Sequence, residues 1–98
     1  MKQKEVVGLV LAADAVIWQA RALQKPRRDL QEIREQTAYL AGQVDSLLVL
    51  YDRSSDDSED LRKQRRAFIV QARDAFWGGS NLSWGIDRLE AFLRTFRQ

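Results

Sequence analysis

Three arginines in the third quarter of the chain have the clearest capacity to bind an anionic partner. Arg62, Arg66 and Arg73 fall within about 40° of one another when residues 57–77 are projected as a helix. Guanidinium groups make planar, multidentate contacts with phosphates and carboxylates. This face fits a nucleic-acid backbone or an acidic protein, but it also fits the acids of residues 52–60 or of a neighbouring helix. Arg65 is placed on the flank of this face nearer the core.

Catalysis and metal binding have few candidate residues in this sequence. The chain contains no histidine and no cysteine, which removes the commonest general base, the commonest metal ligand and any thiol nucleophile. Acid–base chemistry would fall to carboxylates or lysines, and the pattern brings no such pair together. Gly78 and Gly79 lack the spacing of a phosphate-binding loop. We therefore expect no enzyme, no metal site and no cofactor.

Two tryptophans flank the turn over residues 78–83. Trp77 and Trp84 either cap the end of a helical core or form a binding hot spot. Tryptophan is common at such hot spots because it supplies a large contact area at a small entropic cost.

Residues 3–24 carry two apolar stripes, whereas a helix in a bundle needs only one. Val7, Leu11 and Trp18 lie on one side of this predicted helix, beside Asp14. The other, wider stripe predicts the core contact and consists of Val6, Leu9, Val10, Ala13, Val16, Ile17, Ala20 and Leu23. The smaller stripe predicts a docking or dimer surface, because large apolar patches seldom stay exposed on monomers. Alternatively, this helix is central and Trp18 covers the edge of the bundle.

A homodimer is one interpretation of this smaller stripe. Antiparallel pairing about a two-fold axis would bury both copies of it and bring Trp18 near the partner's Val7. Asp14 would then come within reach of an arginine of the other chain, with Arg21 as the candidate. A different protein could instead occupy the same surface.

Four helices are expected to position these side chains, at residues 3–24, 26–51, 57–77 and 81–97. The second helix starts at Pro26 and contains a heptad seam, formed by Leu30, Ile33, Thr37, Leu40, Val44, Leu47 and Tyr51. Its last residues, 47–51, are apolar on all sides, which predicts burial from several directions. Asp56 and Glu59 predict a capping box, Gly78-Gly79 a helix end, and Ser80 or Asn81 a cap. The sequence therefore predicts an all-α, single-domain, antiparallel four-helix bundle over residues 1–98.

Length and composition agree with a small folded domain. The 98 residues are 45% hydrophobic and 31% charged, and a net charge of +2 gives little support for nucleic-acid binding. Lys2 and Lys4 precede an apolar run that imitates a signal peptide. Glu5 and Asp14 oppose that interpretation, and the run falls short of the roughly 20 apolar residues of a membrane span. We expect a cytoplasmic protein without a membrane contact.

The functional prediction is a small non-enzymatic interaction module, such as a regulator, inhibitor or adaptor. Its partner is expected to be another protein, or a second copy of the chain. The alternative is an arginine-dependent nucleic-acid-binding protein.

Overall fold

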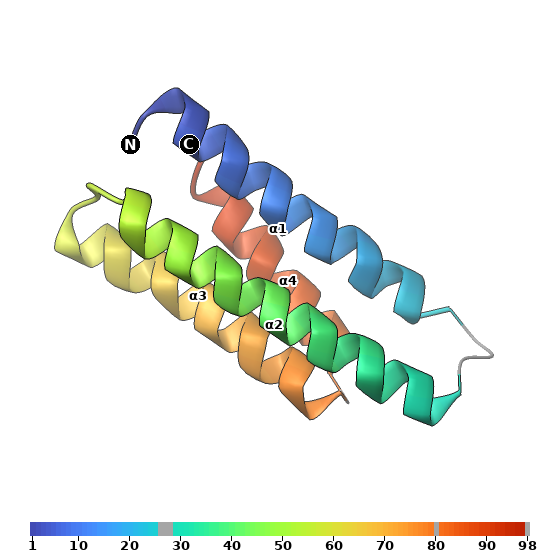
Figure 1. Ribbon diagram of the computed structural model, residues 1–98. Helices are drawn as coiled ribbons and strands as arrows, with labels where there is room; N and C mark the ends of the chain where they lie inside the picture. Colours follow the sequence, from blue (N-terminus) through green and yellow to red (C-terminus); the bar gives the residue numbers. More distant parts are fainter. Residues whose placement is uncertain (26–28, 80, 98) are drawn as a thin grey trace.

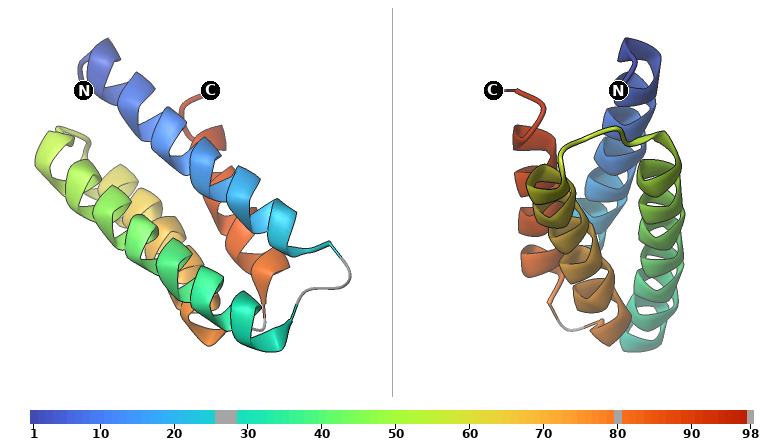
Figure 2. Two further views of the ribbon diagram at one scale, coloured as in Figure 1. Left: turned by 45° about the vertical axis from the view of Figure 1, so that its right-hand side comes forward. Right: turned by 90° about the vertical axis from the view of Figure 1, so that its left-hand side faces the viewer.

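The computed structural model describes residues 1–25, 29–79 and 81–97, and it contains four helices (Figure 1). They are α1 (Gln3–Leu23), α2 (Leu30–Ser54), α3 (Glu59–Gly78) and α4 (Leu82–Arg94). Each helix runs antiparallel to the one before it, as Figures 1 and 2 show. The predicted all-α four-helix bundle is therefore confirmed.

The helices are arranged in a ring. α1 contacts α2 and α4, and α3 contacts the same two helices. In the described part of the chain, α1 and α3 lie diagonally opposite each other, and so do α2 and α4, although Tyr51 of α2 and Phe92 of α4 meet across the core with ring centroids 6.0 Å apart. Each helix therefore has two neighbours and one side that faces solvent. α1 is not a central helix, so no other helix of this chain covers its outer side.

The core lies on the axis of this ring, and all four helices contribute to it. The wider stripe of α1 supplies Leu9, Ala13, Val16, Ile17, Ala20 and Leu23. α2 supplies Leu40, Val44, Leu47 and Tyr51 from the predicted heptad seam. Thr37 interrupts that seam and is also buried, with its hydroxyl donating to the Arg34 carbonyl at 3.1 Å. The hydrogen bond makes this buried polar group tolerable.

Two expectations about burial in α2 are wrong. Val49 and Leu50 are exposed, although residues 47–51 were expected to be buried from several directions. The reason is that α2 has only two neighbouring helices. Leu30 is also exposed, because it is the first residue of its helix and lies beyond the end of the core.

The helix ends follow the expected capping chemistry with one correction. Ser58 caps α3, its hydroxyl accepting from the Leu61 N–H, in place of the predicted box of Asp56 and Glu59. Asp56 instead pairs with the amino terminus of the chain. Asn81 caps α4 as predicted, whereas Ser80 lies outside the described residues.

The start of the second helix also differs from the prediction. α2 is capped by Asp29, whose carboxylate accepts from the Gln31 N–H at 3.2 Å. The predicted start at Pro26 lies outside the described residues.

Two glycines are needed by the geometry around the α3–α4 turn. Gly79 ends α3 with φ of 69°, in the left-handed region that favours glycine. Gly85 lies in α4 against the ring of Phe76, and a Cβ atom there would come within 2.5 Å of that ring. The absence of a side chain at Gly85 thus lets α4 approach α3 closely.

Candidate interaction surfaces

The outer face of α1, formed by Val7, Leu11 and Trp18, is apolar and uncovered. The side chains of these residues are 46%, 63% and 78% exposed, and Trp18 is the most exposed of the large hydrophobic residues described. The opposite side of the same helix is buried in the core. The predicted second stripe therefore exists, and no helix of the described residues packs on it.

Asp14 lies at the edge of this face, in a cleft of about 270 Å³ between α1 and α4. The cleft is lined by Asp14, Ile17, Arg21, Glu90, Leu93, Arg94 and Arg97. Arg21 binds Glu90 across the cleft at 2.6 Å, so the arginine expected to reach a second chain is held within its own. Within the described part of the chain, Asp14 has no ion-pair partner.

The arginines of α3 mostly contact acids of their own chain. The Arg66 Nε atom lies 2.9 Å from Asp52 of α2, and Arg73 Nη1 lies 3.2 Å from Asp45 of α2. Hydrogen bonds to Asp45, and secondarily to Asp74, raise the pKa of the Arg73 guanidinium. Two of the three arginines thus link α3 to α2.

Arg62 pairs with no carboxylate among the residues that the structure describes. Its guanidinium donates to the carbonyl of Ser55, at the end of α2, over 3.2 Å.

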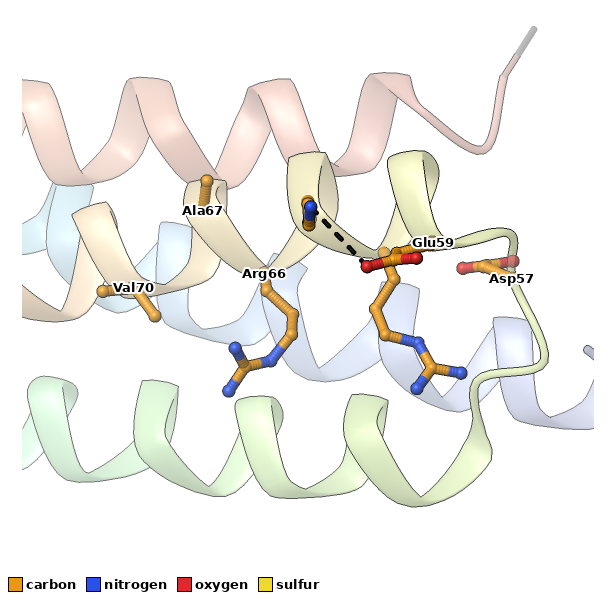
Figure 3. A pocket seen from close by; sticks show the side chains of 7 residues that line it. Asp57, Glu59, Arg66, Ala67 and Val70 are labelled. Carbon is orange, nitrogen blue, oxygen red and sulfur yellow. Dashed lines mark ion pairs between the residues drawn. The ribbon is translucent and has the colours of Figure 1, made fainter.

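An open groove of about 750 Å³ runs along α3 beside these arginines (Figure 3). Its lining includes Asp57, Glu59, Lys63 and Arg66, with Ala67 and Val70 as the apolar part. Glu59 and Lys63 pair one helical turn apart at 3.6 Å, and Figure 3 shows Arg66 extending towards α2. Most charges of the groove are thus already neutralised by a neighbour.

Trp77 and Trp84 are exposed and do not seal the end of the core. The Arg88 guanidinium lies 4.3 Å from the ring centroid of Trp84 and 5.4 Å from that of Phe68. Trp77 is in the last turn of α3, and Trp84 is in the first turn of α4. Trp18, in the C-terminal half of α1, is exposed as well, so all three tryptophans of the chain lie outside the core.

The sequence reasoning missed a buried ionic cluster around Arg65, at the other end of the bundle. Arg65 Nη1 lies 2.6 Å from Asp57 Oδ2, and their side chains are only 7% and 10% exposed. Arg65 also donates from Nε to the Thr95 hydroxyl at 2.8 Å and from Nη2 to the Thr95 carbonyl at 3.1 Å. Its guanidinium lies 3.8 Å from the ring centroid of Phe96. A signal was present, because Arg65 occupies a position in the apolar stripe of α3, four residues before Ile69.

Tyr51 completes this cluster from α2. Its hydroxyl donates to Asp57 Oδ2 at 2.5 Å. Burial raises the pKa of Tyr51, and the hydrogen bond to Asp57 raises it further. Burial pushes the pKa of Asp57 upward, but the hydrogen bonds from Tyr51 and Arg65 outweigh it and lower that pKa overall. The cluster joins three helices and the α2–α3 connection, and every charged group in it has a partner.

The described residues form no metal site, but one of their helices could span a membrane by length and composition. No group of three or more carboxylate, histidine or cysteine side chains in residues 1–25, 29–79 and 81–97 could hold a metal ion. α1 is long and apolar enough to cross a membrane by length and composition, with a mean hydropathy of 1.6 over its most apolar window. Core helices and N-terminal signal sequences pass the same test, so the cytoplasmic location stays a prediction.

Comparisons of the chain with protein-family models, with curated proteins and with solved structures yield no significant match.

Proposed function

We propose that this protein is a non-enzymatic interaction module that binds another polypeptide through the outer face of α1. The observation that carries the proposal is the exposure of Trp18. This side chain lies on the outer face of α1, on the C-terminal side of Leu11, and is 78% exposed. Burying apolar surface releases about 25 cal/mol per Å², so an uncovered tryptophan and leucine on one line favour association. Tryptophan is also the residue type most enriched among the hot spots of protein interfaces.

The chemistry of the chain supports a binding role more than a catalytic one. The sequence has no histidine or cysteine, and its most buried carboxylate, Asp57, is bound by Arg65 and Tyr51. A group held in this way serves the fold, because using it as a base would break the buried ion pair. A regulator, inhibitor or adaptor needs only a stable scaffold and an exposed contact surface, and the chain has both.

Nucleic-acid binding is the second candidate, and it rests on the arginine face of α3. Among the described residues, the Arg62 guanidinium bonds to a backbone carbonyl and to no carboxylate, which leaves its charge available to a phosphate. Arg66 and Arg73 would first have to leave the carboxylates of α2. This exchange weakens the case, because phosphate contacts have to outweigh the ion pairs they replace.

The experiment compares what immobilised wild-type and variant proteins retain from a lysate of the native host. Leu11→Glu puts a charge on the outer face of α1, and Tyr39→Glu is the matched control, an exposed apolar residue of α2. The proposal predicts one set of proteins that wild type and Tyr39→Glu retain and Leu11→Glu loses, with little dependence on salt or nuclease. Retention that disappears with nuclease or moderate salt, and is equal for all three proteins, would favour the arginine face and contradict the proposal.

A further inference from the structure

We propose that the occupant of the outer face of α1 is a second copy of this chain, paired antiparallel about a two-fold axis at Leu11. This inference rests on the proposed function and specifies the partner. It is supported by the order of side chains along α1 and by two charged groups, Lys4 and Asp14, that form no ion pair with the described residues.

The spacing along α1 favours a helix-to-helix contact. Lys4, Leu11 and Trp18 follow one another at intervals of seven residues, which places them on one line along the outer side of the helix. Gly8 and Ala15 lie beside this line and are both exposed. A Cβ atom at Gly8 would meet nothing within 4 Å, so the space above it is open. Small residues at these two positions allow a second helix to approach closely.

The charges on this face complement each other only in the antiparallel direction. With Leu11 opposite its own copy, Lys4 lies opposite the partner's Trp18, because both are seven residues from Leu11. An ammonium group over a tryptophan ring forms a favourable cation–π contact. The partner's Asp14, one helical turn from that tryptophan, comes within reach of the same ammonium group. Parallel pairing would instead set Lys4 against Lys4 and Asp14 against Asp14.

The unpaired state of these two groups agrees with that arrangement. Neither Lys4 nor Asp14 has an ion-pair partner among the described residues. The pairing inferred from the sequence, Trp18 against the partner's Val7, is less favourable, since it sets Lys4 opposite the partner's Arg21. Arg21 also has a partner in its own chain, Glu90 at 2.6 Å, which it would have to leave to bind Asp14 of another chain.

The size of the contact suggests a weak, reversible dimer. α1 has 21 residues and is therefore about 30 Å long. Burying both copies of Trp18 removes on the order of 300 Å² from water. A single pair of helices of this length lies near the lower limit of specific interfaces, about 1,200 Å². We expect dissociation in the micromolar range.

Disulfide cross-linking tests the proposed pairing directly, because the chain has no native cysteine. Three full-length variants each carry one cysteine, Lys4→Cys, Leu11→Cys or Trp18→Cys, and Val49→Cys on α2 is the exposed control. Under mild oxidation, only Leu11→Cys is expected to form a homodimer efficiently, since a disulfide needs Cα atoms within about 7 Å. A mixture of Lys4→Cys and Trp18→Cys is expected to form the mixed dimer at least fivefold faster than either variant alone.

A charge exchange gives a second readout that does not depend on oxidation. Lys4→Glu is expected to weaken dimerisation at least fivefold, and Lys4→Glu combined with Asp14→Lys is expected to restore most of it. Equal cross-linking at positions 4, 11 and 18 would overturn the antiparallel pairing in favour of a parallel one.

Failure of this inference is distinguishable from failure of the proposed function. If Leu11→Cys cross-links no faster than Val49→Cys, the second copy is overturned. The proposed function survives that result if the retention assay still depends on Leu11, which would assign the face to a different protein. Binding of the monomer to phospholipid vesicles, lost in Leu11→Glu, would overturn both in favour of a membrane.

Discussion

Arg65 shows how a single side chain can hold one end of this bundle together. A buried charge is costly unless it is paired and its remaining donors are bonded. Arg65 meets this condition through Asp57, through both oxygens of Thr95 and through the ring of Phe96. The Thr95 carbonyl belongs to the C-terminal end of α4, where a positive charge is favoured by the helix dipole. Removing the Asp57 carboxylate or the Thr95 hydroxyl would leave a buried N–H of Arg65 without a partner.

Arg65→Met and Arg66→Met should therefore differ strongly in stability. Arg65→Met leaves the Asp57 carboxylate buried without its counter-charge and should lower the free energy of unfolding by about 3–5 kcal/mol. Arg66→Met breaks an ion pair with Asp52 in which both side chains are about two-fifths exposed, and should cost less than about 1 kcal/mol. Urea unfolding of the two variants provides the measurement. Equal losses of unfolding free energy in the two variants would mean that the Arg65 cluster stabilises the fold no more than an exposed ion pair does.

The Asp57 carboxyl makes stability depend on pH at the acid end. Its pKa in the folded protein is lowered, so its contribution is complete above the ordinary pKa and is lost as the pH falls through the folded-state value. Asp57→Asn should therefore flatten the acid limb of stability against pH, measured by urea unfolding. The pKa of Asp56 is also lowered, by the amino terminus, so Asp56 contributes to the same limb and is left unchanged in this comparison. An unchanged limb in Asp57→Asn would contradict the assignment.

Gln43 has a buried side-chain oxygen without a hydrogen bond in the described part of the bundle. Its Oε1 atom is buried and has no hydrogen-bond partner among the described residues. A buried acceptor without a partner costs about 1–3 kcal/mol, whereas an apolar side chain of similar length has no such cost. Gln43→Met should raise the free energy of unfolding by roughly 1 kcal/mol in thermal or urea unfolding. A destabilised variant would show that the amide has a bound water or another partner.

At the scale of the helices, two helical glycines, one exposed and one buried, should respond in opposite ways to alanine. Gly42 lies within α2 with nothing within 4 Å of an added Cβ, so Gly42→Ala should stabilise the helix by about 0.5–1 kcal/mol. Gly85 lies within α4 against the Phe76 ring, and Gly85→Ala should destabilise through overpacking, by about 1–3 kcal/mol. Thermal unfolding of the pair checks the close approach of α3 and α4. Stabilisation by both substitutions would refute it.

The helices themselves were predictable because their signals are local. Apolar periodicity gave the core side of α1 and the seam of α2, and Gly79 and Asn81 marked the α3–α4 turn. The errors have long-range causes. The Asp56 carboxylate pairs with the amino terminus, 55 residues away in sequence, and therefore does not cap α3. Val49 and Leu50 are exposed because local patterns do not tell how many neighbours a helix has.

For the candidate surfaces, too, the local features were predictable from the sequence and the long-range contacts were not. The second apolar stripe of α1 was predictable, but its exposure was one of two alternatives, because the sequence does not show that α1 has only two neighbouring helices. The pairing of Arg66 and Arg73 with α2 was one of two alternatives, and the sequence could not choose between them. Arg65 was placed near the core, but its burial depends on Thr95, 30 residues further along the chain.

At the scale of the whole molecule, polar contacts are distributed unevenly around the ring of helices. α2 and α3 are linked by the arginine–aspartate pairs, and α3 and α4 by the Arg65 cluster. α1 is attached by its apolar side and by two polar contacts to α4, Arg21 with Glu90 and Gln24 with Ser83. α1 is thus held to the bundle mainly by its apolar inner side, and its solvent-facing side presents the second apolar stripe.

The central claim is that this face of α1 is a contact surface for a second copy. Sedimentation equilibrium of the wild-type chain over a hundredfold concentration range, beside Leu11→Glu and Tyr39→Glu, tests it most directly. We predict a monomer–dimer equilibrium in the micromolar range for wild type and Tyr39→Glu, and a folded monomer for Leu11→Glu, because Leu11 is 63% exposed and outside the core. A wild-type chain that remains monomeric at the highest concentration, or a Leu11→Glu variant that dimerises as well as wild type, would contradict the claim.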